Sequence, residues 1–371
     1  MSWYLQHFFD PDLDYQQLKP ADTSLSSSDL YNLCYVQNVI QGQILARLVP
    51  LEDVVNPDER YILDEPVLPA GANTTVDKER NYLLATCNGY VFYLQDRITV
   101  KKTLNVRQDI SFATGNVFFV GDVAIHGSVR AGFEVQANNV LVKGMVEGGI
   151  VRARRDLAIV GGGRGGAGQH CLLDAGGDVR SLFMEKIEAR SKGTMFVERS
   201  CLYSSVFAGV NLVVQERMYG GSAHVHSGLV VGDNLGNQAG VPTKVFLGYN
   251  PAHMRQLETV QRRIDENAEA IMHLTAVAGH LPPDASPASR KLANLNDVQD
   301  QLFARRIKLW ESLQCEEAHA RQCRLIVRGT VYPGVEIGIG TAYTVIDQPA
   351  QNVMFTLHEE EIISQPAPGK V

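Results

Sequence analysis

The chain has 371 residues, which is enough for two or three domains with a large hydrophobic core. Hydrophobic residues make up 45% of it and charged residues 20%, the balance of an ordinary folded protein. The formal net charge of -7 argues against a nucleic-acid-binding protein, because such proteins usually carry a basic surface.

Compartment can be predicted from three sequence features. The first residues, MSWYLQHFFDPDLD, lack the basic and long apolar regions of a signal peptide. No run approaches ~18 continuous apolar residues, the length that a membrane-spanning helix needs. The six cysteines form no C-x-x-C pair, which suits a reducing compartment. We therefore expect a cytoplasmic protein with no membrane-spanning segment.

Residues 1–105 are predicted to form an α+β domain. Serines that could cap a helix precede apolar residues at helical spacing, namely Leu30, Leu33, Val36 and Ile40. Further on, two strand-like stretches meet at Asn88-Gly89, a pair that readily adopts a type I′ hairpin turn. This region contains no pattern that indicates chemistry.

Residues 106–250 show a repeat of short β-branched runs separated by glycine, with no helical stripe. Runs recur at steps of 17 residues: Val123–Ile125, Val140–Val142 and Leu157–Ile159, then Met195–Val197 and Leu212–Val214. A further run is expected around Val179. Units that are too small to bury their own apolar face are typical of a β-solenoid, in which each coil stacks on the next.

The stretch AIVGGGRGGAGQ contains the dinucleotide-binding spacing G-x-G-x-x-G at Gly163, Gly165 and Gly168. That motif needs a helix after its third glycine, and Gly176-Gly177 would break any helix within about two turns. We therefore predict no cofactor, and interpret the glycines as corners of the solenoid. The predicted structural glycines are Gly121, Gly127, Gly144, Gly161, Gly163, Gly177, Gly193 and Gly209.

Residues 251–322 are predicted to form an antiparallel coiled-coil hairpin inserted in the solenoid. The first helix begins at Pro251, and its apolar stripe is Met254, Leu257, Val260, Ile264, Ala268, Ile271 and Leu274. The second stripe is Leu292, Leu295, Val298, Leu302, Leu309 and Leu313, interrupted by Arg305 and Arg306, which should point outward. A strand-like sequence pattern over residues 323–363 predicts that the solenoid continues there. Residues 364–371 are predicted to be a disordered tail.

The order of these motifs resembles the Flagellar Assembly Protein A family over roughly residues 60–360. The similar segments include GNVFFVGDVAIHGSVRAGFEVQANNVLVKG, ERMYGGSAHVHSGLVVGDNLG and RGTVYPGVEIGIG, with the helical hairpin between the last two. The resemblance implies a right-handed parallel β-helix that carries a coiled-coil hairpin and an N-terminal α+β domain. It also implies a bacterial cytoplasmic protein linked to flagellar assembly or placement. No catalytic residues are established for the family.

Two sets of residues have the side-chain types of metal or catalytic sites. Cys315, His319 and Cys323 stand four residues apart, so a continuous helix would place them on one stripe that could hold Zn²⁺. However, i and i+8 lie about 12 Å apart in rise, and no fourth ligand is apparent, so buried thiols are favoured. His224 and His226 should point to one face of a strand, where packing is the ordinary role.

These observations favour a non-enzymatic scaffold that binds proteins, including further copies of itself, and no small-molecule substrate. The alternative is a β-helix enzyme or a ligand-binding solenoid. The six-residue spacing of Val123, Val129 and Val135, and the stretch PGVEIGIG, resemble the repeats of left-handed β-helix acyltransferases. An enzyme should show ionisable residues clustered on one solenoid face, and the best available set is Arg152, Asp174 and Glu185.

Overall fold

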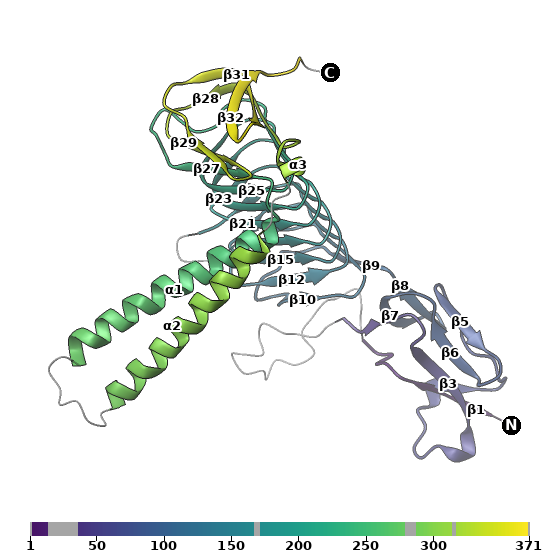
Figure 1. Ribbon diagram of the computed structural model, residues 1–371. Coiled ribbons are helices and arrows are strands. Elements are labelled where there is room, and N and C mark those ends of the chain that lie inside the picture. Colours follow the sequence, from purple (N-terminus) through teal and green to yellow (C-terminus); the bar gives the residue numbers. More distant parts are fainter. Residues whose placement is uncertain (1, 14–35, 167–170, 279–286, 314–316, 370–371) are drawn as a thin grey trace. The chain divides into compact units, whose positions relative to one another are not determined.

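The computed structural model describes residues 2–13, 36–166, 171–278, 287–313 and 317–369 (Figure 1). The chain divides into two compact units. The first comprises residues 1–191 with 196–198, and the second comprises residues 192–195 with 199–371.

The first unit begins with two small antiparallel sheets. The five-stranded sheet has the order β4-β1-β3-β6-β5, formed by Ile62–Leu63, Trp3–His7, Ile44–Pro50, Tyr82–Ala85 and Thr74–Asp77. The three-stranded sheet has the order β2-β7-β8, formed by Asn38–Val39, Gly89–Leu94 and Arg97–Lys101. Two 3₁₀ turns, Leu51–Asp53 and Glu59–Tyr61, follow β3. Leu5, Leu45, Leu83 and Ile98 are almost fully buried and form the core.

The helix predicted near Leu30–Ile40 is wrong for the part that the structure describes. Leu30 and Leu33 lie outside the described residues, whereas Val36 lies in a bend and Ile40 directly follows strand β2. Gly42 turns the chain with a φ of 84°, and β3 then pairs with β1 on one side and β6 on the other. Pairing with both neighbouring strands overrides the local helical spacing.

The predicted turn type occurs, but seven residues beyond the predicted place. Strands β7 and β8 form the hairpin, and Gln95 and Asp96 between them have φ of 50° and 53°. Two positive φ angles are what a type I′ turn requires. Asn88 instead accepts a hydrogen bond from the Gln41 amide through its side-chain oxygen, at 2.9 Å. Strand β6 pairs with β3 and β5, so the hairpin predicted at Asn88-Gly89 is wrong.

The rest of the first unit is a solenoid of parallel strands in three columns. The first column is β9 (Thr103–Val106), β11 (Asp122–Ile125), β13 (Val140–Val142), β16 (Leu157–Ile159) and β19 (Val179–Ser181). The second is β10 (Val117–Phe118), β12 (Glu134–Ala137), β15 (Ile150–Ala153), β18 (Leu172–Ala175) and β21 (Glu188–Ser191). The third is β14 (Val146–Glu147), β17 (Gly163–Arg164) and β20 (Met184–Glu185).

Strand register confirms the repeat in this unit. Val123 pairs with Val140, Val140 with Leu157, and Leu157 with Val179. The last step is longer than the others, so the coil that follows Leu157 accommodates the inserted glycine-rich stretch. Buried apolar side chains alternate with more exposed ones along most of these strands, as Val140 and Val142 do on either side of Leu141, because successive residues point to opposite faces.

Glycines recur at one position of successive coils, at Gly127, Gly144 and Gly161, because the coils approach closely there. A β-carbon on Gly144 would lie 2.5 Å from the Gly127 carbonyl oxygen, and one on Gly161 would meet the Gly144 carbonyl in the same way. Gly163 differs, since its nearest neighbour would be 3.4 Å away and it lies inside strand β17. Gly163, the first glycine of the dinucleotide-binding spacing, is therefore part of a strand. The described chain resumes after residue 170 with strand β18.

The second unit continues with parallel strands and ends in antiparallel ones. One column is β23 (Cys201–Ala208), β25 (Met218–Val225), β27 (Thr243–Leu247) and β29 (Val335–Ile339), closed by β30 (Ala342–Val345). The other is β24 (Asn211–Val214), β26 (Gly228–Val231) and β28 (Arg324–Val331), closed by β31 (Ala350–His358) and β32 (Glu361–Pro366). Strand β22 (Met195–Val197) stands at the division between the units.

Two predictions about the C-terminal end are wrong. The last three strands pair antiparallel, so β30, β31 and β32 do not continue the parallel coils but cover their end. The predicted disordered tail begins too early, since Val353 pairs with Pro366 and the strand β32 includes residues 364–366. A solenoid needs such a cover, because a bare last coil would leave strand edges open.

The helical insertion lies between β27 and β28. Helix α1 (Pro251–Ala278) and helix α2 (Pro287–Ser312) lie side by side in opposite directions (Figure 1), and the short helix α3 (Glu317–Ala320) follows. Among the helices in the described ranges, none is long and apolar enough to cross a membrane.

The seam between α1 and α2 is partly polar. Asn267 donates hydrogen bonds to the Gln299 side chain at 2.7 Å and to the Leu295 carbonyl at 2.9 Å. Arg306 does not point outward as predicted, because it donates to the Gln261 side chain across the seam at 3.0 Å. Val298, predicted as a seam residue, is 44% exposed, and Gln299 takes its place.

Candidate functional site at the root of the helical hairpin

A buried histidine lies where helix α1 meets the solenoid. His224 is only 2% exposed and stacks between Phe207 and Phe246, with 5.1 Å between its ring centroid and each of theirs. The three rings come from β23, β25 and β27, whose parallel register aligns these positions. The stack thus follows from one aromatic residue per coil at a fixed place in the repeat.

Glu258 of α1 reaches this ring from the surface. Its Oε1 lies 2.7 Å from His224 Nε2, while the glutamate side chain stays 46% exposed. The two atoms are at ion-pair distance, but the geometry is not that of a hydrogen bond, since His224 Nε2 has no hydrogen-bond partner. The contact links α1 to the solenoid. His224 is a candidate from the sequence alone, whereas Glu258 is recognised only in the structure.

The second predicted histidine has different partners. The His226 ring stacks on His319 with centroids 4.2 Å apart, and His319 Nε2 lies 2.9 Å from the His226 carbonyl oxygen. Burial, with a smaller contribution from His319, lowers the pKa of His226 below its ordinary value. His224 and His226 therefore do not act as a pair.

The structure describes two of the three candidate metal ligands, His319 and Cys323. Cys323 is buried, and its Sγ lies 3.5 Å from the His226 carbonyl oxygen and 3.5 Å from the His319 carbonyl oxygen. Cys315 lies outside the described residues. Within the described part of the chain, no group of three or more His, Cys, Asp or Glu side chains is arranged to hold a metal ion. The structure thus shows His319 and Cys323 in packing and hydrogen-bonding roles.

Both ends of the insertion meet at one carbonyl group. The Gly248 amide, just after β27, donates to the His226 oxygen at 3.1 Å. Cys323, just before β28, reaches that same oxygen through its thiol. The hairpin therefore leaves and re-enters the solenoid at a single point, and its two connections are close in space.

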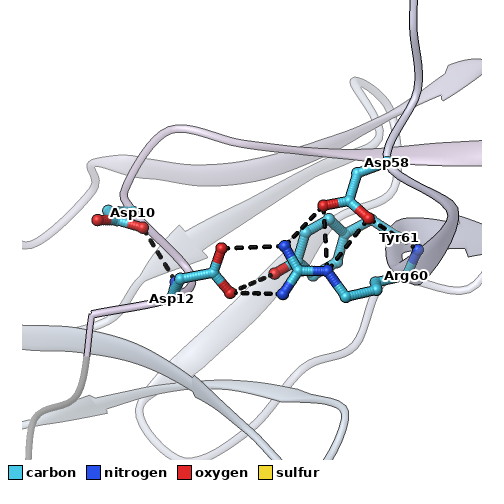
Figure 2. Close-up of polar contacts among 5 residues, drawn as sticks. All are labelled: Asp10, Asp12, Asp58, Arg60 and Tyr61. Atoms are coloured by element: carbon cyan, nitrogen blue, oxygen red, sulfur yellow. Dashed lines mark hydrogen bonds and ion pairs between the residues drawn. The ribbon is translucent and has the colours of Figure 1, made fainter.

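A second cluster of charged groups lies in the N-terminal sheets (Figure 2). Arg60 pairs with Asp12 at 2.8 Å and with Asp58 at 2.7 Å, and the Tyr61 hydroxyl donates to Asp12 at 3.3 Å. The Arg60 guanidinium holds the pKa of both carboxyl groups below the ordinary range. These side chains are largely exposed, so the network ties the loop after β1 to the 3₁₀ turn at Glu59–Tyr61.

His7 lies beside this network in a cage of rings. Its ring is 4.5 Å from that of Tyr61, 5.2 Å from that of Phe9 and 5.3 Å from that of Tyr93, all edge to face. Burial lowers the pKa of His7 to about 4, although the nearby Asp12 carboxylate opposes the shift. The ring is therefore neutral at physiological pH and packs as an aromatic residue.

Three ionisable residues, Arg152, Asp174 and Glu185, were the best candidates from the sequence for an enzyme site on one solenoid face. In the structure each of them pairs with a different residue. Arg152 pairs with Glu134, Asp174 with Arg190 at 3.5 Å, and Glu185 with Arg164 at 2.8 Å. Each of these bonds joins one coil to a neighbouring coil. Pairs of this kind act across strands and add at most about 1 kcal/mol each.

Parallel strands that return in register coil after coil, with a helical insertion between two of them, define a β-solenoid protein. The family comparison is more specific, because the model described as the Flagellar Assembly Protein A beta solenoid domain matches residues 102–362. The match covers more than half of the chain, so the chain belongs to the Flagellar Assembly Protein A family. Neither the curated proteins nor the solved structures contain a significant match.

Proposed function

We propose that this protein is a non-enzymatic scaffold in bacterial flagellar assembly or placement, and that it acts in the cytoplasm. The observation that carries the proposal is the match of residues 102–362 to a flagellar assembly domain. The projecting hairpin and the long solenoid faces supply surfaces for protein partners. The enclosure of His224 between two phenyl rings supports a positioning role for that histidine rather than a catalytic one.

The proposed architecture is a right-handed parallel β-helix with a coiled-coil hairpin. Right-handed connections are the rule where parallel strands of one sheet are joined by a crossover. The hydrogen bond between Asn267 and Gln299 supports a fixed register for the hairpin, since a polar pair in the seam is lost when the helices slip. A fixed register would present the outer faces of both helices in one arrangement to a partner.

The test is a strain that lacks the gene, complemented with either the full chain or a chain without the hairpin. Because Gly248 and Cys323 meet at the His226 carbonyl, a short glycine-serine link can replace residues 251–316 without separating β27 from β28. The proposal expects lost or misplaced flagella in the deletion strain, rescue by the full chain and no rescue by the shortened chain. Circular dichroism of the shortened chain controls for the folding of the solenoid.

Normal flagellar number, position and swimming in the deletion strain would overturn the proposed function. Full rescue by the shortened chain would confine the function to the solenoid and N-terminal sheets, and would remove the hairpin from the proposal. A purified chain that turns over an acyl donor would favour the enzyme alternative instead.

A further inference from the structure

One side of the hairpin exposes large apolar side chains in a row. Phe303, Ile307 and Trp310 of α2 are 36%, 56% and 58% exposed. Their spacing of four and three residues places them on one side of the helix. We call these three residues the α2 flank. Contiguous exposed apolar surface of this kind marks an interaction site more often than does a scattered apolar residue.

Helix α1 extends the same side. Arg306 lies with its guanidinium carbon 5.0 Å from the Phe303 ring centroid and donates to Gln261 of α1, so Gln261 is on the side of the α2 flank. Met272 is 69% exposed but stands about three helical turns beyond Gln261, level with the part of α2 that precedes Phe303, because Asn267 already pairs with Gln299. The row of exposed apolar side chains therefore belongs to α2, and α1 adds polar side chains beside it.

Carboxylates border this surface. Asp300 precedes Phe303 by one turn, Glu311 follows Ile307 by one turn, and both are exposed. On α1, Asp265 accepts a hydrogen bond from Gln261 at 2.9 Å. Arg306 lies on the side of α2 that faces α1, where it donates to Gln261. The border is therefore mainly acidic.

A second copy of the same surface fits poorly. A two-fold contact between α2 flanks would bring Asp300 and Glu311 of one chain toward the same residues of the other. Like charges at an interface oppose association, whereas basic groups on a partner would be attracted. The charge of the border thus selects a cationic partner.

We propose that the α2 flank binds an amphipathic α-helix of a partner protein, with an apolar stripe at least two turns long and lysine or arginine along its edges. A third helix laid on the flank would bury Phe303, Ile307 and Trp310 together and pair its basic edges with Asp300 and Glu311. Trp310 is the expected energetic centre, because large aromatic residues dominate such interfaces. This inference rests on the proposed function and names the partner chemistry for its hairpin.

The experiment uses the full chain with Trp3→Phe, which leaves Trp310 as the only tryptophan. The probe is an 18-residue helical peptide of leucine and lysine with leucine at i, i+3 and i+4, compared with a leucine–glutamate peptide of the same pattern. Binding of the lysine peptide should shift Trp310 emission to shorter wavelength, and the glutamate peptide should not. Added salt should weaken the binding.

Matched variants separate the flank from general attraction to an acidic protein. Ile307→Asn should abolish saturable binding, and the double change Asp300→Asn, Glu311→Gln should weaken it about threefold or more. Val298→Asn is the control, because Val298 is exposed on the other side of α2 and its replacement should leave binding unchanged.

Three results would overturn the inference: no shift with the lysine peptide, equal binding of the glutamate peptide, or equal losses from Ile307→Asn and Val298→Asn. A chain that sediments as a dimer, and as a monomer after Ile307→Asn, would show that a second copy covers the flank. Failure of the peptide test with loss of flagella on hairpin removal would leave the proposed function standing. Peptide binding together with normal flagella in the deletion strain would support the α2 flank as a binding surface and would overturn the proposed function.

Discussion

His224 Nε2 and Glu258 Oε1 are 2.7 Å apart, and they join a buried strand of the solenoid to an exposed turn of helix α1. The imidazole stacks between Phe207 and Phe246. Glu258 therefore contacts a ring that is packed on both faces, and the contact links the first part of α1 to the solenoid.

Replacement of Glu258 by alanine should loosen the first turns of α1. A close contact between a half-exposed carboxylate and an imidazole contributes at most about 1 kcal/mol, so amide exchange in residues 253–264 should accelerate about fivefold or less. Hydrogen exchange with mass spectrometry measures this. Glu266→Ala is the matched control, because Glu266 makes only a long exposed contact with Arg262 at 3.8 Å. Equal acceleration in both variants would assign the effect to the loss of a surface carboxylate rather than to the contact with His224.

Gly144→Ala should destabilise the solenoid, because the new methyl group would lie 2.5 Å from the Gly127 carbonyl oxygen. Overpacking against backbone costs about 1–3 kcal/mol. Gly163→Ala is the comparison, since its methyl group would make ordinary contacts at 3.4 Å or more and should cost less than about 1 kcal/mol. Urea unfolding measures both. A larger loss of stability from Gly163→Ala than from Gly144→Ala would indicate that the dinucleotide-binding spacing has a role beyond strand β17.

The stability of the N-terminal sheets should depend on pH through His7. Its pKa falls from 6.5 to about 4 on folding, so the unfolded chain binds more protons than the folded chain between these values. The contribution of the neutral His7 ring to the free energy of unfolding is complete above about pH 6.5 and is lost as the pH falls toward 4. Urea unfolding followed by Trp3 fluorescence, in a Trp310→Phe chain, should show a lower midpoint at pH 4.5 than at pH 7.

His7→Phe should remove most of this pH dependence while keeping a ring within the cage of Phe9, Tyr61 and Tyr93. His273→Gln, a change at an exposed position of α1, should leave the dependence intact. A pH dependence that persists unchanged in His7→Phe contradicts the assignment.

Two buried cysteines should resist alkylation in the folded protein. Burial raises the pKa of Cys171 to about 11 and that of Cys201 to about 12, which leaves little reactive thiolate at pH 8. Cys87, which is partly exposed, should react with iodoacetamide before either of them. Peptide mass spectrometry locates the modified residues, and unfolding in urea should make all three react. Rapid modification of Cys201 in the folded chain would reveal an opening of its coil.

The repeat predicted the solenoid well because one coil is short and its strands pair with the next coil along the chain. Val123, Val140 and Leu157 therefore show the spacing of their partners directly. The strands near Ile40 could not be recognised this way, because β3 pairs with β1 and β6 at unrelated distances along the chain. Helical spacing in that stretch carried no information about those partners.

The candidate site was predicted only in part for a similar reason. His224 stood out by residue type, and the register of Phe207 and Phe246 could have been inferred from the repeat. Glu258 is one of many charged residues on α1, and its selection requires the direction in which the helix leaves the solenoid. The polar seam was missed because Gln299 and Arg306 fall in a stripe that was traced through leucines alone.

The position of the insertion has a consequence for the order of folding. Strand β26 pairs with β28, and Gly228 must find Arg324 across the whole of the intervening helical segment. The entropic cost of closing a flexible loop rises with its length, whereas a helical hairpin forms from local contacts and brings its own ends together. Early formation of α1 and α2 would therefore shorten the search of β28 for its place. A chain with unstable helices should complete its last coils slowly, even though those coils keep every contact of their own.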